Sequence, residues 1–388
     1  MRVMSEKVKI AVIGVGNMGS NHLGSIAKID NLELAAVCDI DVEKGKKNAE
    51  AQGVAFYDNH TALLAAKCCD AVVVATPHYD HTTIGIDALK AGYHVLVEKP
   101  ISVHKADCQR LIAAYTDPGK VFAAMFNQRT NPRYQKIKDL VESGELGDLQ
   151  RVNWIVTDWF RTEHYYKSGG WRATWKGEGG GVLLNQCPHQ LDLLQWMCGM
   201  PTKVMAVGTI GKYHSIEVED DITAVLEYKN GATGVFVTTT GEAPGTNRLE
   251  VVGTRGKVVC EGGGALTFIR NTVPSDVHCK KSTKSFQVPE RWNVEIPIKG
   301  EGGGHKEILT NFADAIQGKA DLIAPAVEGI HSVELGNAML FSALNNVPVP
   351  LPIDEAGYES FLMEKIASST FVKEESTATD SGDFATSF

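Results

Sequence analysis

The sequence predicts an α/β protein in which a doubly wound parallel sheet is followed by a second α/β domain with a large, mostly antiparallel open sheet. Three observations predict this fold: a glycine-rich turn near the start, repeated strand–helix units up to about residue 97, and consecutive strand patterns after residue 127. The length of 388 residues exceeds the usual size of one hydrophobic core, which also favours two domains.

The N-terminal part alternates strand and helix. Short apolar runs rich in β-branched residues predict strands, and longer amphipathic stretches predict helices. In chain order these are Val8–Ile13 (strand), Asn17–Lys28 (helix), Leu32–Cys38 (strand), Val42–Gln52 (helix), Ala71–Ala75 (strand), Thr82–Lys90 (helix) and Tyr93–Val97 (strand). Repeated units of this kind form a parallel sheet with helices on both faces.

After Asn127 the pattern changes to strands that follow one another. They are Leu149–Val156, Val204–Ile210, Thr223–Tyr228, Ala232–Thr239 and Arg248–Val252. Helical patterns return at His305–Gln317 and Val327–Asn345, and we expect these helices to pack back on a domain. The last residues are rich in Ser, Thr, Asp and Glu, which predicts a mobile tail. We therefore divide the chain into residues 1–127, residues 128–372 and the tail, residues 373–388.

Composition excludes some functions. Lysine and arginine number 38 against 47 aspartates and glutamates, so the formal charge of −9 offers no electrostatic footprint for nucleic acid. No apolar run reaches the ~20 residues of a membrane span, and residues 1–9 lack the apolar stretch of a secretory signal. The eight cysteines form no CxxC pair. We predict a cytoplasmic protein that binds neither nucleic acid nor membrane.

A GxGxxG motif stands where the first predicted strand becomes a helix, and an acidic residue ends the next strand. This arrangement is typical of a Rossmann dinucleotide-binding domain, whose glycines make a tight turn, admit a pyrophosphate and let helix and strand pack closely. The helix N-terminus faces the phosphates with its partial positive charge. The residues expected at the cofactor are Gly14, Gly16, Asn17, Met18 and Gly19.

Two further turns extend this predicted cofactor site. Asp39 would accept hydrogen bonds from the adenosine ribose, and its charge would repel a 2′-phosphate, so NAD is favoured over NADP. Thr76 and Pro77 follow the strand Ala71–Ala75, at the sheet edge where doubly wound folds bind ligands. The alternative for the whole pattern is a plain βαβ unit with a glycine turn.

The stretch His78-Tyr79-Asp80-His81 invites a metal interpretation. Two histidines and one carboxylate lack the further ligands that a site requires, so we predict no metal. Capping of the next helix by Asp80 or His81 is favoured, and His81 also counts among the candidate cofactor contacts.

Two more segments complete a resemblance to a known family. Glu98-Lys99-Pro100 follows the strand Tyr93–Val97, and a glycine-rich segment, Gly179-Gly180-Gly181-Val182-Leu183-Leu184-Asn185-Gln186-Cys187-Pro188-His189-Gln190-Leu191-Asp192, lies in the second half. With GxGxxG in the same order, the chain resembles the Gfo/Idh/MocA oxidoreductases from Val8 to about Phe371. The resemblance implies a Rossmann NAD-binding domain, and a substrate domain whose open sheet carries substrate on one face and commonly forms a homo-oligomer, a dimer or a tetramer.

The resemblance assigns the proton chemistry to Lys99 and His189. Oxidising a secondary alcohol removes the hydroxyl proton as hydride leaves for the nicotinamide, and a desolvated lysine of lowered pKa can take that proton. The resemblance also places Lys99 near the nicotinamide, so Lys99 counts among the cofactor contacts. Glu98 would orient the site or the cofactor, and Asn127 would contact the nicotinamide ribose or carboxamide. The alternatives are a solvated charge at the end of a strand for Lys99, a buried core histidine at position 189 and a polar interdomain linker at position 127. Asp192 is ambiguous, since it could hold an imidazole nitrogen or cap a helix.

Asn185 departs from the inositol dehydrogenase subgroup, which places an aspartate four residues before the histidine. An asparagine cannot be a general base, but it can hydrogen-bond a sugar hydroxyl. The proton must then pass through Lys99 and His189. The resemblance favours the branch that oxidises sugar rings, including nucleotide sugars and glycosides at C3.

Four of the six tryptophans lie between Trp154 and Trp175, among arginine, tyrosine and aspartate side chains. Aromatic faces stack on sugar C–H faces while polar groups fix hydroxyls, so this density favours a carbohydrate site. The alternative places half of them in the sheet core or an oligomer interface. His305 is a weaker candidate to reach the site. The candidate substrate contacts are Lys99, Asp158, Trp159, Arg161, Trp171, Arg172, Asn185 and His189.

These observations predict an NAD-dependent dehydrogenase that oxidises a secondary alcohol of a sugar or glycoside ring, with C3 favoured. A ketone at C3 acidifies neighbouring C–H bonds, which would prepare a glycoside for elimination by a partner lyase or deglycosidase. One alternative is an NAD-dependent glycosidase that acts through transient oxidation. Another is a non-catalytic dinucleotide-sensing regulator, against which the presence of both Lys99 and His189 argues.

Overall fold

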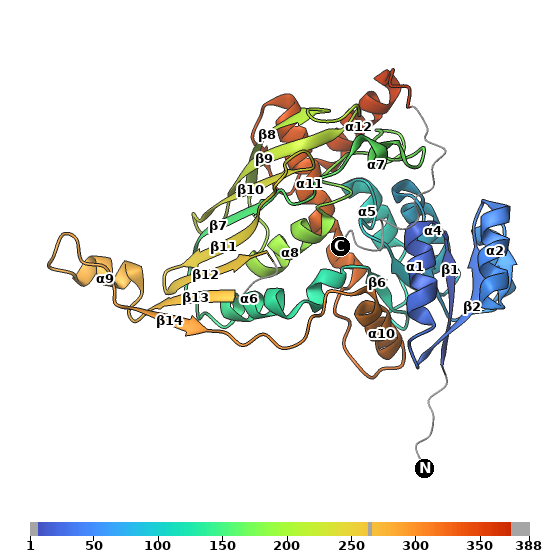
Figure 1. Cartoon of the computed structure of the whole chain (residues 1–388), viewed down its shortest axis with the longest axis horizontal. Helices are drawn as coiled ribbons and strands as arrows, with labels where there is room; N and C mark the ends of the chain where they lie inside the picture. Colours follow the sequence, from blue (N-terminus) through green and yellow to red (C-terminus); the bar gives the residue numbers. More distant parts are fainter. Residues whose placement is uncertain (1–6, 263–265, 374–388) are drawn as a thin grey trace, which may run out of the picture.

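The computed structural model describes residues 7–262 and 266–373 and places two β-sheets side by side, with helices between them (Figure 1). The N-terminal sheet lies at the right of that view and the larger sheet at the left. The predicted tail, residues 373–388, falls outside the described residues except for Lys373. The amine of Lys373 donates to the carbonyls of Gly169 and Arg172 at 2.6 and 2.7 Å.

The first sheet confirms the predicted doubly wound fold. Its strands are β1 (Val8–Ile13), β2 (Leu32–Cys38), β3 (Ala55–Tyr57), β4 (Ala71–Val74), β5 (His94–Val97) and β6 (Phe122–Ala124). They pair in parallel in the order β3-β2-β1-β4-β5-β6. Its helices are α1 (Asn17–Ile26), α2 (Val42–Gln52), α3 (His60–Ala66), α4 (His78–Lys90) and α5 (Lys105–Ala113). Val12, Val73 and Leu96 are fully buried, because the strands of such a sheet are covered on both faces.

The second sheet confirms the predicted large, mostly antiparallel architecture. Its strands are β7 (Leu149–Val156), β8 (Lys203–Ile210), β9 (Glu219–Glu227), β10 (Thr233–Thr239), β11 (Asn247–Gly253), β12 (Gly256–Glu261), β13 (Leu266–Asn271), β14 (Arg291–Glu295) and β15 (Val349–Pro350). Their order is β14-β13-β12-β11-β7-β10-β9-β8-β15. The pair β7 and β10 runs parallel, whereas the other neighbouring strands are antiparallel.

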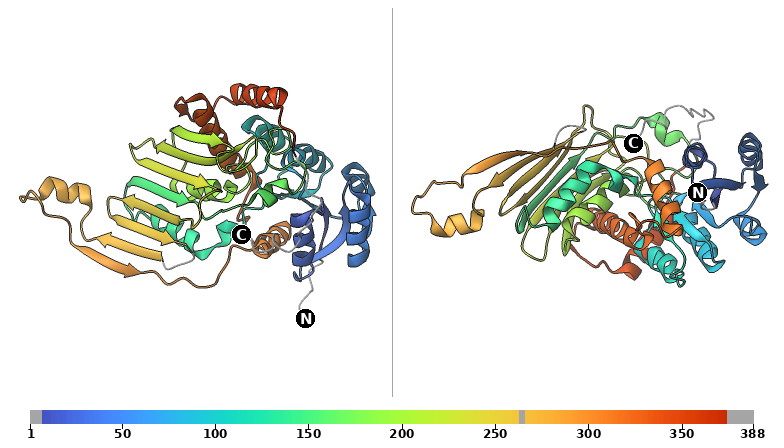
Figure 2. Two further views of the ribbon diagram at one scale, coloured as in Figure 1. Left: turned by 45° about the horizontal axis from the view of Figure 1, so that its top comes forward. Right: turned by 90° about the horizontal axis from the view of Figure 1, so that it is seen from below.

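Helices cover one face of this second sheet and leave the opposite face open within the described part of the chain (Figure 2). The covering helices are α6 (Pro132–Glu142), α8 (Pro188–Cys198) and α11 (Gly329–Asn345). Side chains along β10 alternate accordingly, since Phe236 is buried and Val235 is exposed. Further apolar side chains are exposed on the strands beside it, at Ile155, Met205, Val207 and Val225.

The remaining helices lie in the connections between and beyond these strands. They are η1 (Asn127–Thr130), α7 (Glu163–Lys167), α9 (Ser275–Lys281), α10 (His305–Ile316), η2 (Ala326–Glu328) and α12 (Glu355–Ser368). Helix α10 packs on the first sheet, where Leu309 and Phe312 are fully buried. The core of the first sheet thus contains residues from the N-terminal part of the chain and from α10. The domain boundary at residue 127 stays a prediction. No helix of the described residues is long and apolar enough to span a bilayer.

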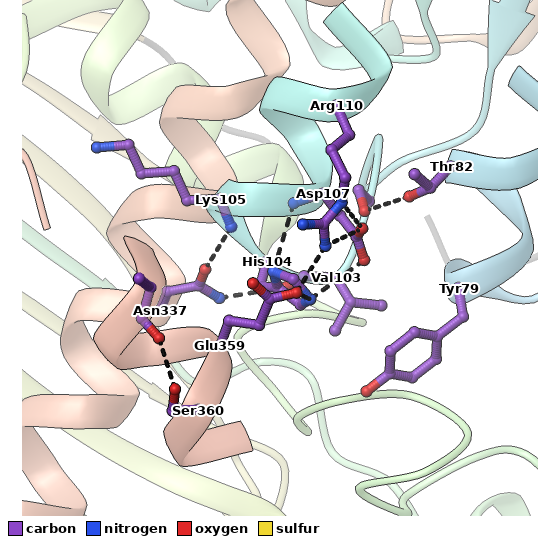
Figure 3. A network of polar contacts seen from close by, with 12 residues as sticks. Tyr79, Thr82, Val103, His104, Lys105, Asp107, Arg110, Asn337, Glu359 and Ser360 are labelled. Atoms are coloured by element: carbon purple, nitrogen blue, oxygen red, sulfur yellow. Dashed lines mark hydrogen bonds and ion pairs between the residues drawn. The ribbon is translucent and has the colours of Figure 1, made fainter. Parts of the chain in front are cut away.

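A polar network anchors the start of α5 to helices of the second half (Figure 3). His104 caps α5, because its Nδ1 accepts from the Asp107 N–H at 3.4 Å and its Nε2 lies 3.1 Å from the Asp107 carboxylate. Asn337, on α11, accepts from the Lys105 N–H at 3.0 Å and donates to the Val103 carbonyl at 3.2 Å. The segment that follows β5 is therefore fixed to α11.

Candidate active site

The glycine-rich turn between β1 and α1 leaves room for a pyrophosphate. Gly14 has φ +87°, and a Cβ there would lie 2.7 Å from the Ala75 carbonyl oxygen. A Cβ at Gly19 would lie 1.8 Å from the Gly14 carbonyl oxygen, so a larger residue would push α1 away from the turn. A Cβ at Gly16 would meet no described atom within 4 Å, and no described side chain caps α1. Free N–H groups therefore face open space at the first residues of the helix, Asn17 and Met18.

Asp39 ends β2 beside this turn and is buried. Its Oδ2 accepts from the Val15 N–H at 2.8 Å, and its Oδ1 accepts from the Asp41 N–H at 2.8 Å. Lys44 Nζ lies 3.8 Å from Oδ2. The two backbone donors fix the carboxylate while each oxygen keeps a lone pair for a further donor.

The turn after β4 corrects one prediction. The N-cap of α4 is Pro77, so neither Asp80 nor His81 caps the helix and the predicted capping is wrong. His81 is buried instead, and its two ring nitrogens each lie 2.8 Å from a carbonyl oxygen, those of Thr76 and Pro100. It therefore ties the turn after β4 to the loop after β5. Within the described ranges no three His, Cys, Asp or Glu side chains are grouped to hold a metal ion.

Glu98 is held by a buried histidine that no sequence motif marks. His22, on α1, places its Nε2 2.7 Å from Glu98 Oε1, and both side chains are buried. The ring of His305 packs edge-on against that of His22 at 5.5 Å between centroids. Burial alone would raise the pKa of Glu98, but the hydrogen bond and charge of His22, with His305 and Lys99, lower it to about 2. Glu98 is therefore a permanent carboxylate at this end of the sheet.

Lys99 joins the two halves of the molecule. Its Nζ donates to the main-chain carbonyl of Asn185 at 2.9 Å, and its backbone N–H donates to Glu98 at 3.1 Å. Burial lowers the pKa of the amine, while the charge of Glu98 opposes that shift and the charge of Arg172 adds to it. A lowered pKa is what a proton-accepting lysine needs.

His189 lies in the first turn of α8, with its ring edge-on to Phe126. The ring is buried, and neither nitrogen has a hydrogen-bond partner among the residues that the structure describes. Burial and the charge of Lys99 lower the pKa of His189 well below its usual value. A neutral imidazole with two unused nitrogens can donate to or accept from a substrate hydroxyl. We call Lys99 and His189 the proton-handling pair.

Asp192 takes neither of its two predicted roles. It lies inside α8, and its carboxylate accepts from Arg129 Nε at 2.8 Å and from Arg129 Nη2 at 2.7 Å. Arg129 Nη1 also donates to Glu328 at 2.5 Å. Asp192 therefore holds η1 against α8, and it neither caps a helix nor orients the imidazole of His189.

Asn127 begins η1 and faces the loop that leads into α10. Its Nδ2 donates to the carbonyl of Gly303. Its Oδ1 is buried and has no partner in the described part of the chain. The amide is thus fixed by one end, and its oxygen is left to accept from a bound group.

The aromatic cluster gathers around Asn185. Tyr165 donates from its hydroxyl to Asn185 Oδ1 at 3.3 Å, and Arg172 Nη1 donates to the Tyr165 oxygen at 2.7 Å. The guanidinium groups of Arg161 and Arg172 lie 5.2 and 4.5 Å from the centre of the Tyr165 ring. Trp171 belongs to the same cluster, because the Arg172 guanidinium lies 4.8 Å from the centre of its ring. Polar donors and aromatic faces therefore share one surface beside the carbonyl that binds Lys99.

The structure separates the other predicted substrate residues. Trp159 is half-buried at the edge of the cluster, 5.5 Å from the Arg161 guanidinium. Asp158 is exposed at the end of β7, and within the described residues no contact joins it to the proton-handling pair. Trp154 and Trp175 are core residues, 0% and 4% exposed, as the alternative interpretation held for part of the group.

Three polar residues near the proton-handling pair escaped sequence reasoning. The one sequence signal for His22 is its position three residues after the motif glycine Gly19. Glu178 precedes the glycine run directly and is 1% exposed. Arg129 follows Asn127 by two residues, yet its partner Asp192 is 63 positions away along the chain.

A doubly wound parallel sheet that brings a half-buried lysine close to a buried histidine of a second domain is typical of a two-domain, dinucleotide-dependent oxidoreductase. The model of the GFO/IDH/MocA oxidoreductase family, NAD-binding Rossmann fold, matches residues 8–126, and the model of the GFO/IDH/MocA C-terminal domain matches residues 134–259. The chain belongs to this family, which confirms the resemblance, and it is an NAD-dependent oxidoreductase.

Relatives with named activities are distant in sequence. The myo-inositol 2-dehydrogenase of Thermotoga maritima is 28% identical over 269 residues, which cover 68% of this chain and 78% of that protein. The D-glucoside 3-dehydrogenase of Escherichia coli K12 is 26% identical over 369 residues, which cover 89% and 98%. A crystal structure of the WlbA dehydrogenase from Chromobacterium violaceum, in complex with NADH and UDP-GlcNAcA, has a TM-score of 0.78 at 29% identity, covering 91% of this chain and 98% of that one.

Proposed function

We propose that the protein oxidises a secondary alcohol of a sugar or glycoside ring to a ketone, with NAD as the coenzyme. The proton-handling pair carries this proposal. Lys99 and His189 are close enough for the charge of one to lower the pKa of the other, and the imidazole has no described partner. A hydroxyl placed between them finds both an acceptor for its proton and a second hydrogen-bonding group, which supports alcohol oxidation.

Residues of the first domain fit a dinucleotide. The pyrophosphate is proposed over Gly16, and the adenosine ribose at Asp39, whose charge favours NAD over NADP. Thr76 Oγ1 and Asn127 Oδ1 are buried and lack partners within the described ranges, so each can bind a polar group of the coenzyme. When bound, the nicotinamide ring supplies the acceptor for the hydride. Lys44, 3.8 Å from Asp39, is the one observation that favours a 2′-phosphate.

The proton path is proposed to begin at the substrate hydroxyl and end on Lys99 Nζ. The contact with the Asn185 carbonyl holds this amine in place at 2.9 Å. Glu98 lies next to it with a carboxylate that stays charged, so the ammonium formed by proton transfer is stabilised. His189 is proposed to donate to the substrate oxygen, because it is neutral and buried.

We place the sugar ring against Asn185, Tyr165, Arg172 and Trp171, where aromatic faces and donors alternate. Oxidation at C3 is the position we favour, in line with the D-glucoside 3-dehydrogenase to which the chain is similar. The resulting ketone would acidify C2–H, and a partner lyase or deglycosidase could then expel the group on C1. Two guanidinium groups on one tyrosine ring favour a nucleotide sugar as a second substrate class.

The uncovered face of the second sheet is proposed to join copies of the chain into a dimer or a tetramer. Val225 lies opposite Val235 on one side and Met205 on the other, so three exposed apolar side chains form a row across three strands. Contiguous apolar surface of this kind marks interaction sites. A second copy laid face to face would bury the row.

The test follows reduced-nicotinamide absorbance while NAD or NADP is offered with glucosides, free sugars, inositols and nucleotide sugars. We expect NADH with one class of ring substrate. Lys99→Met should lower turnover by about 10² to 10⁴ without changing NAD affinity, because only the proton acceptor is lost. Lys176→Met, at an exposed position of the same region, is the matched control and should stay active. Folded protein that binds NAD but reduces it with none of these compounds would refute the proposal.

The same assay recognises the glycosidase alternative. A glycosidase that works through transient oxidation releases reducing sugar from a glucoside without net formation of NADH. The non-catalytic regulator is not supported, because the chain keeps both a half-buried Lys99 and a buried His189, close enough for the charge of Lys99 to lower the pKa of His189.

A further inference from the structure

A buried carboxylate lies behind the proton-handling pair. Glu178 is 1% exposed in the loop before α8. Its Oε2 accepts from the Ala173 N–H at 2.6 Å, and its Oε1 accepts from Asn185 Nδ2. Burying a carboxylate is costly, and these two donors with the charge of Arg172 offset that cost, so the structure keeps a carboxylate in this place.

One residue separates this carboxylate from the reactive amine. The main-chain carbonyl of Asn185 accepts a hydrogen bond from Lys99 Nζ, and its side-chain Nδ2 donates one to Glu178. The Tyr165 hydroxyl donates to Asn185 Oδ1 at 3.3 Å, which fixes the amide with its nitrogen toward Glu178. An amide neither gains nor loses a proton, so Asn185 cannot relay a proton between Glu178 and Lys99. It can only be oriented and polarised by Glu178.

We propose that Glu178 is a positioning residue that supplies, through Asn185, the negative charge that an aspartate at position 185 would supply itself. This inference rests on the proposed function. The carboxylate orients Asn185 so that its carbonyl meets Lys99, and it favours the ammonium form that Lys99 takes after accepting the substrate proton. The side chain next to the proposed sugar, Asn185, is therefore uncharged. The negative charge lies behind it, on Glu178.

Other charged groups also shift the pKa values of Lys99 and Glu178. Burial lowers the pKa of Lys99, and Glu98 and Glu178 both oppose this shift. Burial raises the pKa of Glu178, and Arg172 is the first of the groups that oppose it. Titratable or charged groups that face Lys99 are Glu98, Arg172, Glu178, Cys187, His78, His189 and His305. Those that face Glu178 are Arg172, Lys373, His78, Tyr166, Glu219 and Lys99.

Glu178→Gln removes the charge and keeps the shape. The base must be neutral to accept a proton, so kcat/KM for oxidation rises with pH through the pKa of Lys99. Without the carboxylate that pKa falls, and the half-maximal pH should move down by about one unit. NAD affinity should not change. Glu163→Gln, which alters a carboxylate on α7 that binds the Ser215 N–H, is the matched control and should keep the wild-type profile.

The decisive variant exchanges the two groups. In Glu178→Gln/Asn185→Asp the carboxylate stands at position 185 and the amide at 178, so the hydrogen bond between them is kept with its direction reversed. We expect the profile to return at least half of the way to the wild type. Glu178→Asp, which keeps the charge on a shorter stem, should leave the profile in place and lower kcat/KM, and it serves if Glu178→Gln does not fold.

Failure of this inference differs from failure of the proposed function. A wild type that oxidises no sugar refutes the function. The inference then stands or falls on the pH dependence of Lys99 modification by acetic anhydride, followed by mass spectrometry, which needs no turnover. An unchanged Lys99 titration in Glu178→Gln, or an exchanged variant that behaves like Glu178→Gln alone, would overturn the role of Glu178.

Discussion

Removing the acidic half of the buried pair between Arg129 and Asp192 should cost the protein much of its stability. Two N–H groups of Arg129 reach the carboxylate at 2.8 and 2.7 Å, and the side chains are 0% and 1% exposed. Breaking such a pair leaves an uncompensated buried charge, at a cost of about 3–5 kcal/mol. Because Arg129 keeps Glu328 at 2.5 Å, we expect Asp192→Asn to lose about 3 kcal/mol, the lower end of that range.

Urea unfolding followed by tryptophan fluorescence measures this loss. Trp196 is a local reporter, because its ring lies 5.4 Å from the Arg129 guanidinium. The control is Arg129→Met/Asp192→Leu, which removes both charges and should recover most of the stability. A loss below about 1 kcal/mol in Asp192→Asn would contradict the reasoning. A double variant as unstable as the single one would assign the loss to packing, not to charge.

Three further predictions concern the coenzyme, pH and assembly. Asp39→Ser should shift the preference between NAD and NADP about tenfold toward NADP in initial-rate assays, since the repelling carboxylate is lost and Lys44, which keeps Asp41 at 3.8 Å, can also approach a 2′-phosphate. Glu98 has its pKa lowered from 4.5 to about 2, so its stabilisation of about 3 kcal/mol is complete above pH 4.5 and is lost as the pH falls toward 2. The gap in unfolding free energy between wild type and Glu98→Gln should close over that window, and a constant gap would contradict the assignment. If the wild type sediments as the proposed dimer or tetramer, Val225→Glu should sediment as a single folded chain, and an unchanged mass would exclude the sheet face as the interface.

The first sheet was predictable because its strands carry their signal locally. Val12 and Val73 belong to β-branched apolar runs that are buried on both faces, and such runs stand out from the helices between them. Strand β14 carries no such signal, since nearly all of its side chains are exposed. The parallel pairing of β7 with β10 depends on residues such as Arg151 and Thr233, which lie far apart in the chain, so no local pattern contains it.

The candidate site divides in the same way. Gly14 and Gly19 were predictable because the backbone leaves no space for a Cβ at either position. The charges around the proton-handling pair were not, because a carboxylate such as Glu178 looks like any surface residue until the fold buries it. The predicted roles of Asp192 and the predicted capping role of His81 failed for a related reason. Both take partners from other elements, an arginine and two carbonyl groups, which sequence spacing does not reveal.

The hydrogen bond from Lys99 to the Asn185 carbonyl bears on when Lys99 can accept a proton. Lys99 follows β5 of the first sheet, whereas Asn185 precedes α8 of the second domain, so this bond exists only while the two domains stand together. A movement that separated the two domains would break this bond and admit water to the amine. Relief from burial would then return the pKa of Lys99 toward that of an ordinary lysine, and the amine would be protonated and idle. In the proposed mechanism Lys99 is therefore a competent base only while the two domains enclose it.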